Sequence, residues 1–294
     1  MIRFIKWLLM SLPPVRRHLF GDFPPGHFYS PIPFMDDVRR NEARLFDRSL
    51  RELSGIDLNV DGQLNLLSQL KQFYGEQPFS AEPSAVLRYY FENDFYSYSS
   101  GIFLYCMIRF AQPKRIIEIG SGFSSFAMLD TNELFFDGRI RLTFIEPHDR
   151  RLRSRLKDKD LEVAEIISKR VQEVELARFD ELVAGDILFV DSSHVAKVGS
   201  DVNHILFEIL PRLSSGVFVH FHDMFYPFEY PKEWIEKGRF WNEDYVLRAF
   251  LQYNSVFKIR IWNQFLGIFH PEKLAESMPL CMKDIGSSLW LQRV

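Results

Sequence analysis

Short apolar runs alternate with charged, amphipathic segments along the chain from about residue 113 onward. Apolar runs bounded by turn residues are typical of buried strands, and the amphipathic segments between them are typical of helices. This alternation predicts a parallel sheet covered by helices. We expect seven strands, at residues 115–119, 141–146, 162–167, 186–191, 217–220, 258–262 and 265–269.

Helices are expected between these strands, at residues 124–132, 149–157, 201–213 and 242–253. Only Asn263 and Gln264 separate the last two expected strands, which predicts a hairpin and therefore one antiparallel strand. The predicted fold class is α/β, a Rossmann-like, doubly wound, seven-stranded sheet with a C-terminal antiparallel hairpin.

The first part of the chain has a different texture. Residues 21–38 are rich in proline and are expected to be extended, whereas apolar spacing predicts helices at 41–53 and 64–73. We therefore predict a helical and loop N-terminal extension over residues 1–94 and a Rossmann-like domain over residues 95–294. Residues 1–12 are apolar with two basic residues, but Pro13 and Pro14 follow too early for the roughly 20 residues that span a bilayer. An amphipathic docking helix is the preferred interpretation, and contact of this helix with a membrane surface is the alternative.

Composition excludes some classes of protein. The 294 residues are 47% hydrophobic, enough for a substantial core. Lys and Arg number 36 against 39 Asp and Glu, so no global positive field favours nucleic acid. The two cysteines show no metal or disulfide spacing, which fits a reducing, cytoplasmic location.

The strongest local signal is an apolar strand that runs through Glu118 into the turn Gly120-Ser121-Gly122 and then into a helix. Glycines let the backbone approach a ligand closely, and the N–H groups at the start of a helix suit a polar or anionic group. A purely structural turn is the alternative. A dinucleotide fingerprint needs a third glycine, but that position is Ser125. The carboxylate of Glu118 suits a cofactor with a cationic amino group and would repel a pyrophosphate.

A second acid, Glu146, ends the next strand and is followed by Pro147. A carboxylate at this place can accept hydrogen bonds from both hydroxyls of a ribose. NAD enzymes and methyltransferases share this feature, so Glu146 supports a nucleoside ligand without choosing between them. A solvated acid at a strand end is the alternative interpretation.

With these motifs, residues 95–270 resemble a class I S-adenosylmethionine-dependent methyltransferase of the family 24 type, near the sugar and macrolide O-methyltransferases. The resemblance implies that the glycine turn holds the amino-acid part of S-adenosylmethionine and that Glu146 holds its ribose. The cofactor-binding set is then expected to be Glu118, Gly120, Ser121, Gly122, Glu146, Pro147 and Asp191. The adenine is expected near residues 168–171, where no diagnostic acid occurs.

A third group of polar residues follows two further expected strands. Asp191 and His194 follow one strand, and His222 and Asp223 follow the other, so both pairs are expected at the same edge of the sheet. We predict these four residues as catalytic, with His194 or His222 as the base that removes a hydroxyl proton. The resemblance also implies a divalent cation such as Mg²⁺ on Asp191 and Asp223, and local hydrogen bonding is the alternative role. Aromatic residues 224–231 and 28–31 are candidate lids over an acceptor.

The predicted function is methyl transfer from S-adenosylmethionine to an oxygen of a small-molecule or glycan-like acceptor. Two other functions remain as alternatives: a Rossmann-type nucleotide-binding oxidoreductase and a non-catalytic protein that binds S-adenosylmethionine. A homodimer is a further alternative among the partners, and nucleic acid is not expected. The N-terminal helices are left open as a lid, a dimerisation arm or a membrane-docking element.

Overall fold

The computed structural model describes residues 21–294, and the helix predicted at residues 1–12 lies outside the described part. The chain divides into two compact units, one of residues 1–49 and 229–240, the other of residues 50–228 and 241–294. The first unit contains the short helices α3 (Met35–Arg40), α4 (Glu42–Leu45) and α10 (Lys232–Glu236). The second contains the sheet, and everything that follows on the site belongs to this unit.

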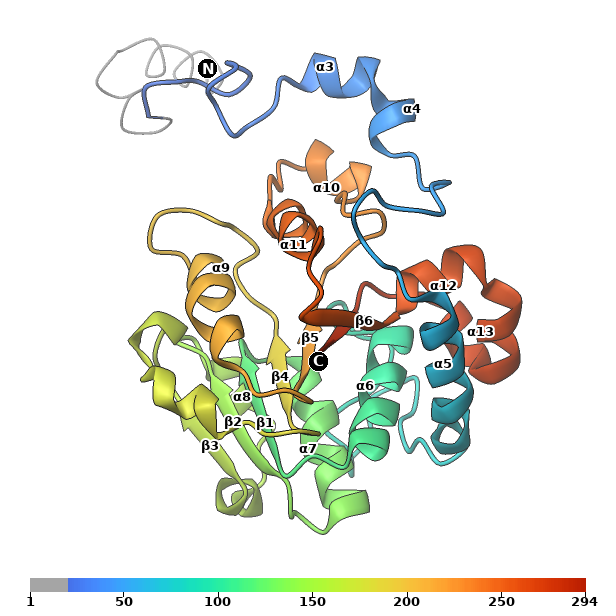
Figure 1. The fold of residues 1–294 in the computed structure, drawn as a ribbon. Helices are drawn as coiled ribbons and strands as arrows, with labels where there is room; N and C mark the ends of the chain where they lie inside the picture. The colour runs from blue at the N-terminus through green and yellow to red at the C-terminus, as the bar shows by residue number, and fades with distance from the viewer. Residues whose placement is uncertain (1–20) are drawn as a thin grey trace, which may run out of the picture. The chain divides into compact units, whose positions relative to one another are not determined.

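A seven-stranded sheet organises the second unit, with strand order β3-β2-β1-β4-β5-β7-β6 (Figure 1). The pairs among β1 to β5 are parallel, and β7 is antiparallel to both β5 and β6. The strands are β1 (Arg115–Ile119), β2 (Arg141–Ile145), β3 (Ala164–Ile167), β4 (Ile187–Val190), β5 (Phe218–Phe221), β6 (Phe257–Trp262) and β7 (Leu289–Arg293).

The register of the central strands brings three loops together. Ile119 at the end of β1 is level with Ile145 of β2 on one side and with Val190 of β4 on the other. Because these strands are parallel, the residues that follow them meet at one edge of the sheet. This edge is where the strand order reverses direction, the usual place for a ligand in an open α/β sheet.

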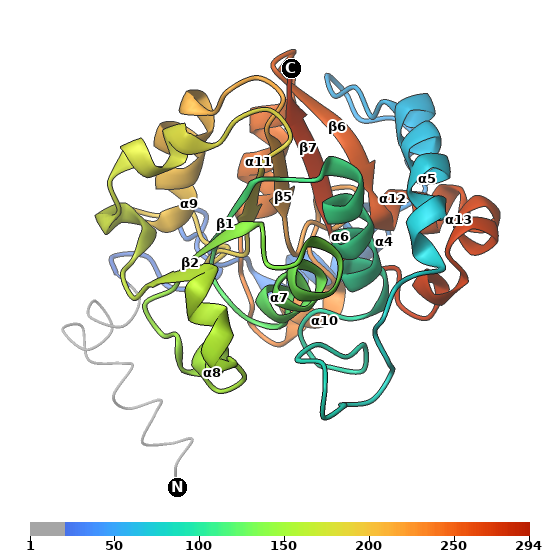
Figure 2. The ribbon, with the colours of Figure 1, turned by 90° about the horizontal axis from the view of Figure 1, so that it is seen from below.

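Helices cover both faces of the sheet. Figure 2 shows α7 and α8 on one side of β1 and β2, and α9 on the other side. The helices of this unit are α5 (Val60–Tyr74), α6 (Tyr98–Ala111), α7 (Phe123–Phe136), α8 (Arg150–Arg153), α9 (Asp201–His204), α11 (Glu243–Leu251), α12 (Asn263–Phe269) and α13 (Pro271–Ser277). Short 3₁₀ segments are η1 (Asp158–Glu162), η2 (Val171–Glu173), η3 (Leu176–Glu181), η5 (Leu210–Arg212) and η6 (Pro279–Met282), and η4 (Ile205–Ile209) is a π-helical turn.

The fold class is confirmed, and six of the seven predicted strands are found within a few residues of their expected positions. The predicted strand at 265–269 is wrong, because this segment is helix α12. A short apolar run does not distinguish a buried helix from a strand. The antiparallel partner of β6 is instead β7, whose Leu289, Trp290 and Leu291 are fully buried.

Three predicted helices also need correction. The helix expected at 41–53 ends at Leu45, and Asp47 then accepts a hydrogen bond from the N–H of Ser49 at 2.8 Å, a local turn that competes with helix. The helix expected at 149–157 is the single turn α8. The segment 201–213 is helical but passes from α9 through a π-helical turn into η5. Among the described residues no helix is long and apolar enough to cross a membrane.

Candidate active site

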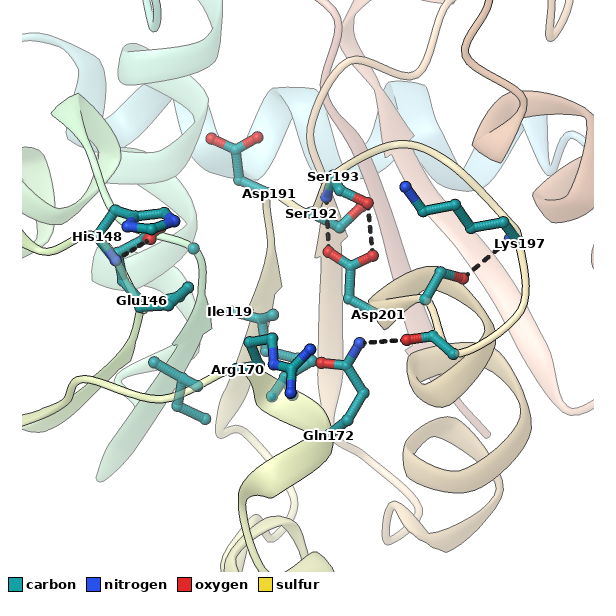
Figure 3. Close-up of a pocket in the computed structure, with 16 residues that line it drawn as sticks. Ile119, Glu146, His148, Arg170, Gln172, Asp191, Ser192, Ser193, Lys197 and Asp201 are labelled. Carbon is teal, nitrogen blue, oxygen red and sulfur yellow. Dashed lines mark hydrogen bonds between the residues drawn. The ribbon is translucent and has the colours of Figure 1, made fainter. Parts of the chain in front are cut away.

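A cleft of about 410 Å³ opens at the edge where β1, β2 and β4 end. In Figure 3 Glu146 and His148 line one side of this cleft, and Ser193 and Asp201 line the opposite side. Its lining residues come from the four loops that follow β1, β2, β3 and β4: Ile119, Gly120, Ile145, Glu146, Pro147, His148, Arg170, Val171, Gln172, Asp191, Ser192, Ser193, Lys197, Gly199, Ser200 and Asp201.

The two glycines of the turn after β1 play different parts. Gly120 has a positive φ of 97°, and a Cβ there would overlap the carbonyl oxygen of Asp191. Gly120 is therefore required by the fold itself. Gly122 is extended, and a Cβ there would meet only the Nη1 atom of Arg151, at 3.9 Å. The space in front of Gly122 is therefore open in the protein.

Glu118 lies beneath this turn and is fully buried. Its two carboxylate oxygens accept hydrogen bonds from the hydroxyls of Ser124 and Ser125 at the start of α7. Ser125 also accepts a hydrogen bond from the N–H of Gly122 at 3.0 Å, so the carboxylate holds the turn through this serine. Burial raises the pKa of Glu118 to about 8, although the two hydroxyls oppose this shift.

Glu146 reaches the cleft from the end of β2. One of its carboxylate oxygens accepts the N–H of His148 at 2.7 Å, which fixes the side chain in the turn after the strand. The other oxygen forms no hydrogen bond within residues 21–294 and lines the cleft with Pro147. A carboxylate fixed in this way can accept hydrogen bonds from a hydroxylated ligand.

The structure brings together all four residues predicted as catalytic. The Nε2 atom of His194 lies 3.4 Å from a carboxylate oxygen of Asp191 and 3.8 Å from one of Asp223. The Nε2 atom of His222 lies 3.5 Å from the other oxygen of Asp223. Both His194 and Asp223 have positive φ, 60° and 57°, a strained conformation that clusters at functional sites.

A further residue of this cluster, not expected from the sequence, is Glu243, the first residue of α11. This glutamate is 1% exposed, and its carboxylate lies 2.8 Å from the Nδ1 atom of His194. It also accepts a hydrogen bond from the hydroxyl of Ser192 at 2.9 Å. The carbonyl oxygen of His194 in turn accepts the N–H of Glu243. The sequence does show an acidic residue at the start of this amphipathic helix. Its contact with His194 cannot be predicted from the sequence, because the burial of Glu243 depends on how α11 packs against the loop after β4.

The charged groups of this cluster shift one another's pKa values. Burial alone would lower the pKa of His194, but its contacts with Asp191 and Glu243 raise it well above the usual value. Burial likewise raises the pKa of Asp191, but contact with His194 and electrostatic interaction with His222 and Arg151 outweigh it and hold this pKa below the usual value. The carboxylates around His194 therefore favour its protonated form.

His222 is held by the segment before α6. Its Nε2 atom lies 3.2 Å from the carbonyl oxygen of Phe95, which can only accept, so Nε2 donates this hydrogen bond. The neighbouring His220 points into the core, where it stacks on Phe189 with ring centroids 3.9 Å apart. Burial keeps the pKa of His220 well below its usual value, so this residue is neutral.

Two sequence-based hypotheses look different in the structure. Within the part of the chain that the structure describes, no group of three or more His, Cys, Asp or Glu side chains is arranged to hold a metal ion. The candidate lid at 224–231 begins in the core, because Met224, Tyr226 and Phe228 are at most 1% exposed. Phe28 and Tyr29, by contrast, are 79% and 65% exposed.

The sheet order and the cleft at the reversal point, with a glycine turn and a second-strand acid, place this unit in the Rossmann-like α/β class. The family model described as a methyltransferase domain matches residues 117–224 of this chain, which include the glycine turn and all four clustered residues. An uncharacterized protein of Archaeoglobus fulgidus is 36% identical over 188 residues, which cover 62% of this chain and 84% of that protein. Residues 117–224 of this chain are therefore similar to a methyltransferase domain.

Solved structures with low similarity are also methyltransferases. The O-methyltransferase TomG from Streptomyces achromogenes, in complex with S-adenosylmethionine, is 16% identical with a TM-score of 0.43. That alignment covers 88% of this chain and 96% of TomG. The methyltransferase PaMTH1 of Podospora anserina, bound to S-adenosylhomocysteine, is 13% identical with a TM-score of 0.42, covering 90% of this chain and 98% of that one.

Proposed function

We propose that this protein binds S-adenosylmethionine in the cleft at the ends of β1, β2 and β4 and methylates an oxygen atom of its acceptor. The observation that carries the proposal is the open space in front of Gly122 together with the fixed carboxylate of Glu146. Gly120, Ser121 and Gly122 would follow the amino-acid part of the cofactor, and Glu146 beside Pro147 would bind its ribose.

The remaining walls of the cleft fit the other parts of this ligand. Residues 170–172 line the side of the cleft formed after β3, where the buried Val171 gives an apolar contact for an adenine ring. Asp191, whose pKa is held low, would face the cationic end of the amino acid. Glu118 lies beneath the turn, and its role is to fix the glycine backbone through Ser125.

The chemistry needs a group that accepts a proton. When bound, S-adenosylmethionine supplies an activated methyl group, whose bond to sulfur breaks as a bond to the acceptor oxygen forms, leaving S-adenosylhomocysteine. We assign proton removal to His194, whose Nε2 atom accepts the hydroxyl proton once this nitrogen is deprotonated. Glu243 accepts the Nδ1–H of His194 and so keeps Nε2 directed at the acceptor side. Asp223 lies 3.8 Å from the Nε2 atom of His194 and 3.5 Å from that of His222.

The acceptor is proposed to be a small molecule or a glycan-like compound with a free hydroxyl. Trp241 stacks on His194 with ring centroids 4.4 Å apart, so an aromatic surface adjoins the proposed base. Such a surface suits a sugar ring or another flat ligand. The cytoplasmic location, a homodimer, membrane contact by residues 1–12 and the domain boundary at residue 95 remain predictions.

A divalent cation on Asp191 and Asp223 is the second mechanism. As arranged, these residues do not fit a metal ion, because a carboxylate oxygen of each already faces the Nε2 atom of His194. We therefore derive no step through a metal. Methyl transfer that is lost in EDTA and restored by Mg²⁺ would establish the metal-dependent mechanism instead.

The decisive experiment is calorimetric titration of the purified protein with S-adenosylmethionine, S-adenosylhomocysteine and NADH. We expect binding of the first two and none of NADH, since Ser125 replaces the third glycine of a dinucleotide fingerprint. Glu146→Ala should weaken binding by about 1 to 3 kcal/mol. Binding of NADH alone would support an oxidoreductase.

Release of S-adenosylhomocysteine in the presence of pooled hydroxylated acceptors then tests turnover. Cofactor binding with no turnover on any pool would leave a non-catalytic binding protein as the better description. Asp191→Asn and Asp223→Asn are expected to lose turnover, and wild-type rates in both would remove these acids from the mechanism.

A further inference from the structure

Arg151 is a cation on α8 that forms no ion pair within 4.0 Å among the described residues, although its charge acts on Asp191. The neighbouring Arg153 pairs with Asp149 at 2.8 Å, as expected for a solvated helix face. The guanidinium of Arg151 instead lies over the ring of Phe95, 4.0 Å from its centroid. Phe95 stacks in turn on Phe123, the first residue of α7, with ring centroids 5.9 Å apart.

This stacking places the guanidinium at the glycine turn. The Nη1 atom of Arg151 is the atom that bounds the open space in front of Gly122, 3.9 Å from the point where a Cβ would stand. The backbone of Phe95 is held by the hydrogen bond that its carbonyl oxygen accepts from His222, and its side chain is 53% exposed. Arg151 is exposed as well, so its guanidinium borders the turn at the surface of the protein.

The electrostatics of this space favour an anion next to Arg151. The acids around the turn are Glu118, Glu146 and Asp191. Among the basic groups nearby, Arg155 lies over the ring of Phe123 and two histidines contact Asp191 or Asp223, whereas Arg151 is the cation whose Nη1 atom faces Gly122. Guanidinium groups bind carboxylates with two parallel N–H donors. The positive end of the 14-residue helix α7 lies at the same turn and adds to the preference for negative charge.

An α-amino acid carries both charges at one carbon atom, and the site offers a cation and an acid for it. We propose that Arg151 binds the α-carboxylate of the amino-acid half of S-adenosylmethionine, while Asp191 faces the α-ammonium group. This inference rests on the proposed function, since it names the residue that recognises one group of the proposed cofactor. The basic residues of α8 are thus not equivalent, because Arg153 pairs with Asp149 whereas Arg151 faces the glycine turn.

The test compares two ligands that differ only in the carboxylate. We would measure the affinity of wild-type protein, Arg151→Gln, Arg151→Lys and Arg150→Gln for S-adenosylmethionine and for its decarboxylated analogue by calorimetry. Arg150→Gln is the matched control, because it removes the same charge from the adjacent position of the same helix. Thermal unfolding of each variant checks that it is folded.

We expect Arg151→Gln to weaken binding of S-adenosylmethionine about tenfold or more, and Arg151→Lys to restore part of this loss. The wild-type protein should bind the decarboxylated analogue more weakly, and Arg151→Gln should weaken that binding no further. An equal loss for both ligands would show that Arg151 only supports Phe95, and unchanged affinity in Arg151→Gln would also overturn the proposal. A wild-type protein that binds neither compound would instead overturn the proposed function.

Discussion

At the scale of single residues, the contact between Glu243 and His194 decides how the proposed base works. The carboxylate lies 2.8 Å from the Nδ1 atom, and both side chains are almost fully buried. Three carboxylates surround this imidazole, those of Glu243, Asp191 and Asp223, and together with Trp241 they form its immediate environment. The protonated form is therefore stabilised in the folded protein.

This environment predicts the pH dependence of catalysis. His194 accepts a proton only when it is neutral, so kcat/KM should rise with pH until His194 has lost its proton, at a pH well above its usual pKa. Glu243→Gln removes one negative charge, so the rising limb should move to lower pH. His194→Ala should lower kcat about 10²- to 10⁴-fold. A pH–rate profile for each variant checks this, with the exposed Glu272→Gln as the control.

The raised pKa of His194 also makes the stability of the folded protein depend on pH. A histidine whose pKa is raised on folding stabilises the protein fully below its unfolded pKa, and this contribution is lost as pH rises through the folded pKa. Glu243→Gln should therefore destabilise the protein more in mildly acidic than in alkaline buffer. A pH profile that is unchanged in Glu243→Gln would remove the glutamate from its assigned role.

At the scale of elements, the turn between β1 and α7 combines a structural glycine with one that keeps space open. The positive φ of Gly120 and the nearby Asp191 carbonyl leave no room for a side chain. Gly122 has neither restriction. The two glycines of one motif therefore serve the fold and the ligand separately.

This difference predicts opposite outcomes for two alanine variants. Gly122→Ala should fold with nearly wild-type stability, within about 1 kcal/mol, but bind S-adenosylmethionine at least about tenfold more weakly. Gly120→Ala should be destabilised by about 1 to 3 kcal/mol, because its backbone conformation is strained for alanine. Urea unfolding and calorimetry measure the two effects. Wild-type affinity in Gly122→Ala would show that the ligand does not occupy this space.

At the scale of the whole molecule, a buried ion network ties the segment before α6 to the sheet domain. The guanidinium of Arg88 bonds to Asp130 on α7 and to Asp160 on η1, and Asp130 also accepts the N–H groups of Arg88 and Tyr89 at 2.8 Å. Burial opposes the charge of Arg88, but these acids raise its pKa. This segment leads directly to Phe95, which contacts the site.

Removal of this cation should be costly for stability. Arg88→Met leaves two buried carboxylates without their partner, so we expect the free energy of unfolding to fall by about 3 to 5 kcal/mol. Arg139→Ala is the control, because its ion pair with Asp137 is exposed and 3.8 Å long. Equilibrium urea unfolding of both variants gives the comparison. An equally small change in the two variants would contradict the importance of the network.

The sequence by itself determined the fold class, the first six strands, the glycine turn and the acid at 146. These features depend on local patterns, namely apolar runs, glycine and the residue that ends a strand. The sequence also predicted that the polar residues after β4 and β5 lie close together, because the ends of parallel strands meet at one edge of the sheet.

Only the tertiary structure decided the rest. The strand β7 was missed because its burial between β5 and β6 is a long-range property that a short apolar run does not report. The sequence does not indicate that Glu243 contacts His194 or that Arg151 lies over Phe95, because both contacts depend on packing between distant segments. The charge of a side chain is fixed by the sequence, but the group that it faces depends on how distant segments pack together.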